Sequence, residues 1–132
     1  MELLLKITGF ALMALAGIHL VFPKYFSWKK DLEPISLINM QMMYVHTFFI
    51  GITVFLMGVL CIFCTSDIVN TRLGKQVSLG LSFFWGLRLI FQFLVYSPRL
   101  WKGKRFETAM HILFSLLWIY LTVIFLLVYL SE

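Results

Sequence analysis

Apolar positions along this chain fall into four long runs, at about residues 3–22, 38–63, 77–96 and 109–130. An α-helix rises about 1.5 Å per residue, so each run is long enough to cross a hydrocarbon layer of roughly 30 Å. The connecting segments are short and hold most of the charged residues. The pattern predicts an all-α integral membrane protein, a four-helix bundle with four transmembrane helices.

Composition agrees with this class, because 61% of the residues are hydrophobic and only 13% are charged, which is untypical of a soluble domain. The connections leave no room for a second domain, so residues 1–132 are expected to form a single transmembrane domain. The first run lacks a basic start and continues past Ala16 to Phe22. We therefore expect a retained helix rather than a cleaved signal peptide.

Basic residues are unevenly divided between the two ends of the predicted bundle. Three lie on the side of the termini, and seven flank the first and third connections: Lys24, Lys29, Lys30, Arg99, Lys102, Lys104 and Arg105. Lysine and arginine in short loops favour the cytoplasmic side. The pattern predicts both termini on the non-cytoplasmic side of an inner, cytoplasmic-type membrane.

The net charge of +5 does not indicate nucleic-acid binding here, because the basic residues flank membrane spans and alternate with aromatic ones. Such segments contact anionic headgroups at the membrane surface. The residues expected to contact lipid or headgroups are Arg99, Trp101, Lys102, Lys104 and Arg105. An ordinary solvated topology signal, or a docking site for a cytoplasmic partner, explains the same segment.

Three histidines occur in three different apolar runs, and counting from the helix ends places all three near the same membrane face. His19, His46 and His111 are each expected roughly 6–9 Å below that face, with Gln92 at a similar depth. Arg88 lies deeper, at roughly 15 Å, and no acidic residue is expected at its level. Polar residues inside a membrane are costly, so this cluster is a candidate functional site.

A b-type haem is the first ligand that these residues suggest. Two imidazoles from facing helices can ligate iron, and basic groups can hold the propionates. The predicted ligand pair is His46 and His111, with His19 able to replace either. Arg88 or Arg99 would hold the propionates.

A non-haem metal is the second possibility, with His19, His46, His111 and Glu107 as ligands. The alternative to both is that the polar residues only join helices through hydrogen bonds or hold a lipid or quinone headgroup.

Cys61 and Cys64 form a Cys-x-x-Cys at the end of the second run, which resembles the quinone-linked disulfide-generating membrane enzymes. Those enzymes use a second cysteine pair that this chain lacks, so an inert structural pair is the prediction. Small residues at Ser78, Ser82 and Gly86 predict a close neighbour for the third run, either inside the bundle or in another subunit.

The leading functional hypothesis is a membrane subunit that binds a redox cofactor, haem b or a metal, in the His/Arg/Gln cluster. The alternative is a structural or accessory subunit of a membrane complex. Membrane lipid and a homo-oligomer or partner subunit are the expected partners. The residues do not indicate whether the protein is an enzyme.

Overall fold

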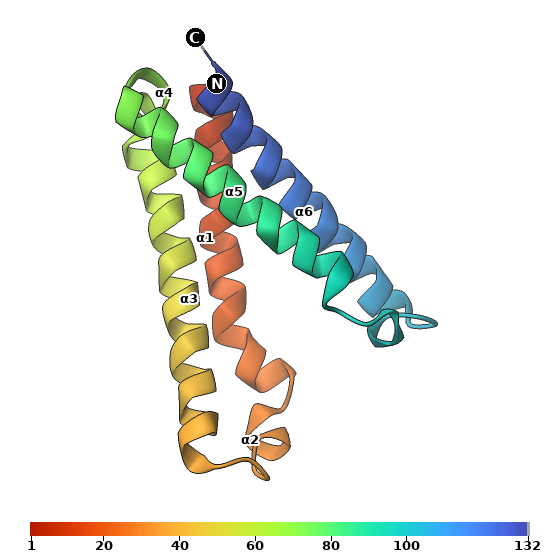
Figure 1. Ribbon diagram of the computed structural model, residues 1–132. Coiled ribbons are helices and arrows are strands. Elements are labelled where there is room, and N and C mark those ends of the chain that lie inside the picture. Colours follow the sequence, from red (N-terminus) through yellow and green to blue (C-terminus); the bar gives the residue numbers. More distant parts are fainter. Residues whose placement is uncertain (132) are drawn as a thin grey trace. The chain divides into compact units, whose positions relative to one another are not determined.

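A computed structural model describes residues 1–131 of the chain. Every regular element in this range is helical, which confirms the predicted all-α fold. The elements are α1 (Glu2–Tyr25), α2 (Trp28–Asp31), α3 (Leu37–Phe63), α4 (Thr65–Asn70), α5 (Arg72–Leu94), η1 (Pro98–Leu100) and α6 (Arg105–Leu130) (Figure 1). Within the described residues, α1, α3, α5 and α6 are long and apolar enough to cross a membrane. The chain is a multi-pass membrane protein.

All four long helices begin before the apolar runs that predicted them, α3 by a single residue. α5 begins at Arg72 instead of residue 77, because the Thr71 hydroxyl caps it by accepting a 3.0 Å hydrogen bond from the Gly74 amide. α6 likewise begins four residues early, at Arg105, and α1 continues through Pro23 to Tyr25. Helical turns continue into the polar interface, so an apolar run marks the part in lipid and not the whole helix.

Residues 3–65 form one compact unit, in which α1 and α3 pack side by side and antiparallel (Figure 1). The backbones approach closely at Gly9 and Gly58. A Cβ atom on Gly58 would lie 2.7 Å from the Gly9 carbonyl oxygen and 2.8 Å from Cγ of Met13. Two facing glycines remove the side chains that would separate the helices, which increases van der Waals contact in lipid.

The remaining helices form a second compact unit, in which α5 and α6 lie antiparallel (Figure 1). The Ser82 hydroxyl donates a 2.8 Å hydrogen bond to the Thr122 carbonyl, and the Lys75 ammonium group donates to the Ser131 carbonyl. Gly86 also faces Thr122, because a Cβ there would lie 3.6 Å from Cγ2 of Thr122. The small face of α5 therefore packs against α6 of the same chain.

Replacing Gly9 with alanine tests the close approach of α1 and α3. The new Cβ would lie 2.6 Å from Cγ1 of Ile62 and 2.8 Å from the Gly58 carbonyl oxygen. We expect the free energy of unfolding to fall by about 1–3 kcal/mol, the usual cost of overpacking. Unfolding in mixed micelles, followed by circular dichroism, measures it.

Gly17→Ala is the matched control, because it lies on the same helix and a Cβ there meets no atom within 4 Å. It should leave stability unchanged or raise it by up to about 1 kcal/mol, since alanine is the better helix former. Equal losses in both variants would contradict the predicted contact.

Candidate functional site

The side chain of Gln92 organises a polar network between α5 and α6. It is buried, with 7% of its surface exposed. Its Oε1 accepts hydrogen bonds from Nη1 of Arg88 at 3.2 Å and from Nε1 of Trp118 at 3.4 Å. Its Nε2 lies 2.9 Å from Nδ1 of His111. One amide thus joins a cation, an indole and an imidazole.

The donor and acceptor roles in this network are fixed by the chemistry of its side chains. Arginine and the indole N–H can only donate, so the oxygen of Gln92 must face Arg88 and Trp118. The amide nitrogen then faces His111 and donates to its Nδ1. A neutral imidazole that accepts at Nδ1 carries its proton on Nε2. His111 therefore presents an N–H donor at Nε2 and no free lone pair.

Arg88 lies six residues before the last residue of α5, about 9 Å from the end of that helix. Its guanidinium carbon is 4.9 Å from the ring centroid of Trp118 and 5.4 Å from that of Tyr96, which are cation–π distances. No carboxylate among residues 1–131 forms an ion pair with it. The side chain is held by an amide and two rings, and its charge is not neutralised by them.

Aromatic rings surround the network. The Trp118 ring stacks on Trp85 at a centroid distance of 5.2 Å and on Phe114 at 5.7 Å. The Trp101 ring stacks on His111 at 3.8 Å, with 9° between the planes. The Thr108 hydroxyl donates to the Trp101 carbonyl at 2.8 Å, so the connection before α6 is tied to the first turn of that helix.

Sequence reasoning missed part of this arrangement. Trp101 was assigned only to the membrane interface, although the structure places its ring on His111. Arg88 and Gln92 are four residues apart on α5, as side chains on one helix face are, and their side chains are hydrogen-bonded. Tyr96, two residues beyond the end of α5, contacts the same guanidinium. Trp101 comes from a connecting segment, where periodicity gives no direction for the side chain. The other residues predicted to contact headgroups are exposed: Arg99, Lys102, Lys104 and Arg105.

The two other histidines belong to the α1–α3 unit. His19 is half-buried in α1, and its Nδ1 lies 3.0 Å from the Leu15 carbonyl oxygen. A carbonyl only accepts, so Nδ1 carries the proton and Nε2 keeps its lone pair. His46 is exposed on α3 and makes no hydrogen bond within the described part of the chain. The structure thus groups His111 with Gln92 and Arg88, and places His19 and His46 on the other unit.

The residues predicted to bind a metal or to act in redox chemistry do not form a metal-binding group within residues 1–131. Residues 1–131 contain no group of three or more His, Cys, Asp or Glu side chains that could hold a metal ion. Glu107 is half-buried in the first turn of α6. Cys61 is buried, Cys64 is half-buried, and both are free thiols. Metal binding and redox activity at these residues stay predictions.

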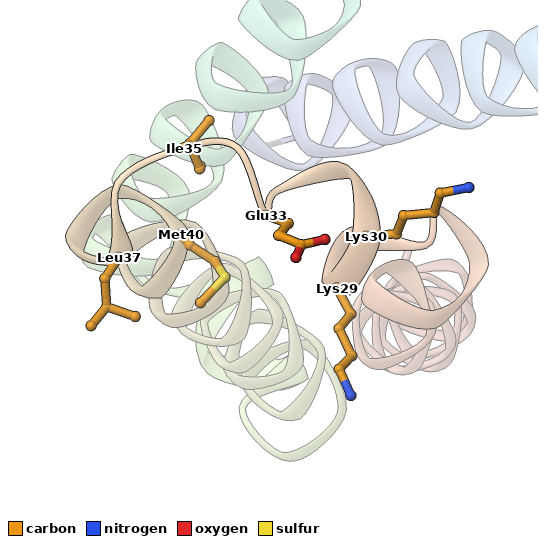
Figure 2. A pocket seen from close by; sticks show the side chains of 6 residues that line it. All are labelled: Lys29, Lys30, Glu33, Ile35, Leu37 and Met40. Atoms are coloured by element: carbon orange, nitrogen blue, oxygen red, sulfur yellow. The ribbon is translucent and has the colours of Figure 1, made fainter.

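A shallow hollow lies on the connection between α1 and α3. Glu33 lies near Lys29 and Lys30, and the ammonium groups of the two lysines point away from its carboxylate (Figure 2). Trp28 of α2 is buried and packs edge-on against Tyr44 at 5.5 Å, which holds this connection to α3. The hollow is an open, basic surface of the kind that contacts headgroups at a membrane interface. Its lining is completed by Ile35, Leu37 and Met40.

Comparisons with protein families, with curated proteins and with solved structures find no match to this chain. The function must therefore be argued from the geometry of its own residues.

Nitrogen NMR of histidine tests the two proton positions directly. In ¹⁵N-histidine-labelled protein in alkaline buffer, where imidazoles are neutral, we expect His19 to carry its proton on Nδ1 and His111 on Nε2. Gln92→Leu removes the donor to Nδ1 of His111, so the proton of His111 should no longer favour Nε2. The His19 signals should stay unchanged. Signals are assigned from single His→Asn variants. The same proton position in His19 and His111 would contradict the hydrogen bonds described above.

Proposed function

We propose that this membrane protein binds the anionic headgroup of a membrane amphiphile, a lipid phosphate or carboxylate, at Arg88 of the α5–α6 unit. The observation that carries the proposal is the guanidinium of Arg88, which has two aromatic neighbours and one amide partner but no carboxylate. An uncompensated cation within a membrane span is costly, and a bound anion offsets that cost.

The free donors of the site suit such a ligand. A guanidinium has five N–H groups, and the structure gives one hydrogen bond from it, to Gln92. The rings of Trp118 and Tyr96 contact the guanidinium through their faces. N–H groups along its edge can donate in pairs to two oxygens of one anion. The Nε2–H of His111 is a separate donor, on the residue at the other end of the Gln92 amide.

Charges nearby favour the same ligand. The connection between α5 and α6 carries four exposed basic residues: Arg99, Lys102, Lys104 and Arg105. Basic residues beside a membrane span attract anionic lipid, with about 1 kcal/mol for each one near the surface. These residues would raise the local concentration of anionic amphiphiles at the end of the unit where Gln92 and His111 meet.

Haem b remains a separate proposal for the same cluster. Arg88 would hold a propionate in the same way as a lipid headgroup. Axial ligation by Nε2 of His111, however, requires that nitrogen to lose its proton. The proton would move to Nδ1 and face the amide nitrogen of Gln92. Turning the amide round would place its N–H₂ against Arg88 and Trp118, which are both donors. The hydrogen bonds therefore favour an anionic headgroup over an iron ligand.

Arg88→Gln tests the headgroup proposal. We expect binding of a pyrene-labelled phosphatidylglycerol to detergent-solubilised protein to weaken about 10-fold to 100-fold, because a charge-assisted hydrogen bond contributes about 1.5–3 kcal/mol. Quenching of tryptophan fluorescence measures the affinity, and pyrene-labelled phosphatidylcholine and inorganic phosphate serve as comparison ligands.

Arg72→Gln is the matched control, because it removes the same charge from the exposed first residue of the same helix. It should leave the affinity within about twofold. Equal weakening in both variants, or equal affinity for the neutral lipid, would contradict a site at Arg88. Competition by inorganic phosphate would assign the site to a free anion instead of a lipid.

A visible absorption spectrum separates the headgroup proposal from haem. We expect protein purified from a haem-supplied host to lack the split bands of a reduced b-type haem. Split bands with stoichiometric iron that disappear in His111→Ala would instead support ligation by His111, and their loss in His46→Ala as well would support the predicted ligand pair.

A further inference from the structure

A cavity of about 350 Å³ lies on the α1–α3 unit. Its apolar lining comes from Leu20, Pro23, Val45, Phe48 and Phe49, and its polar lining from His19, Tyr44 and Thr47. Apolar walls with a few polar groups are typical of small-molecule sites. Leu20, Val45, Phe48 and Phe49 are exposed, so the cavity is accessible from the face of the unit that lipid covers.

His19 provides acceptors in this cavity. Its Nδ1 is occupied by the Leu15 carbonyl, so Nε2 is the nitrogen left for a ligand, and it carries a lone pair. Pro23 has no N–H to donate to the His19 carbonyl four residues earlier, so that carbonyl lacks its usual helical donor. A ligand that pairs with Nε2 of His19 must bring a hydrogen-bond donor.

Packing holds the imidazole in position. A Cβ atom on Gly51 of α3 would lie 3.2 Å from Cβ of His19, so α3 presses closely against this residue. The ring of Phe22 lies 5.0 Å from the imidazole, centroid to centroid. Contact on two sides limits the rotamers of His19, which preorganises Nε2 for a ligand.

The other two polar residues of the cavity have free hydroxyl groups. Neither Tyr44 nor Thr47 makes a side-chain hydrogen bond within residues 1–131. The Tyr44 ring is held edge-on by Trp28 at 5.5 Å. A hydroxyl both donates and accepts, so a second oxygen of the same ligand can pair with either residue.

From these features we infer that the cavity binds the headgroup of a lipid-soluble quinol, with one ring hydroxyl donating to Nε2 of His19. A flat ring suits walls built from Phe48, Phe49 and Pro23, and a neutral ligand suits a cavity whose lining contains no charged side chain. A quinol carries the donors that His19 requires, whereas the oxidised quinone offers only carbonyl acceptors. Binding should therefore favour the reduced form.

This site is chemically distinct from the one at Arg88. The α5–α6 network presents donors and suits an anion, whereas His19 of the α1–α3 cavity presents an acceptor and suits a hydroxyl. The two sites use different residues on different units, so the quinol inference does not depend on the proposed function.

Binding of decylubiquinol and decylubiquinone to the full-length protein, measured anaerobically in detergent, tests the inference. We expect the quinol to bind about tenfold more tightly than the quinone, the effect of one hydrogen bond that the quinone cannot donate. In ¹⁵N-histidine-labelled protein, the quinol should shift the Nε2 signal of His19 and leave the signals of His46 unchanged.

Substitutions at His19 complete the test. His19→Leu should abolish the preference for quinol, and His19→Gln should restore part of it, because the amide oxygen of glutamine is also an acceptor. His46→Leu is the matched control: it removes an exposed imidazole outside the cavity lining and should keep the full preference.

Several outcomes would overturn the inference. One is equal affinity for the two oxidation states in the unsubstituted protein. Another is a quinol-induced shift confined to His111, which would place the ligand on the α5–α6 unit. A third is an undiminished preference in His19→Leu. The NMR shift in unsubstituted protein keeps the inference testable even if that variant does not fold.

Discussion

The absence of water from the hydrocarbon layer is the constraint on which this structure depends. A polar group in a membrane span is costly unless the protein or a ligand pairs with it. Gln92 shows the consequence most clearly, because both ends of its amide are used: the oxygen by Arg88 and Trp118, the nitrogen by His111. One buried amide sets the direction of its hydrogen bonds to Trp118 and His111 of α6.

The direction of the hydrogen bond at Nδ1 determines whether each of two histidines, His19 and His111, offers a donor or an acceptor to a ligand. His111 accepts from Gln92 at Nδ1 and so presents a donor, whereas His19 donates from Nδ1 to the Leu15 carbonyl and so presents an acceptor. Two residues of the same type, both half-buried in apolar helices, therefore suit opposite ligands. The difference comes from one neighbour of each histidine, Gln92 for His111 and the Leu15 carbonyl for His19. It makes the proposed site at Arg88 suit an anion and the proposed site at His19 suit a hydroxyl.

Close helix packing supports both arrangements. Gly9 and Gly58 let α1 and α3 approach, and Gly51 leaves room for His19 against α3. On the other unit, Ser82 and Gly86 bring α5 against Thr122 of α6. Apolar side chains alone drive little association between helices in lipid, so small residues and a few hydrogen bonds carry much of the specificity.

The class of protein and its four long helices follow from the sequence alone, because hydrophobicity and length are enough to identify a membrane span. The same reasoning found the polar residues worth examining and the shared face of Arg88 and Gln92, since helical periodicity relates positions on one helix. Helix ends were less predictable. The capping of α5 by Thr71 and the extension of α1 through Pro23 lie outside the apolar runs.

Tertiary structure decided which helices share a site. It placed His111 beside Gln92, set Trp101 over that ring, and kept His19 and His46 on the other unit. It also decided where the imidazole proton lies on His19 and on His111. Periodicity along one helix contains no information about the rotation of a neighbouring helix or the path of a connecting segment, and those two quantities determine which polar atoms meet.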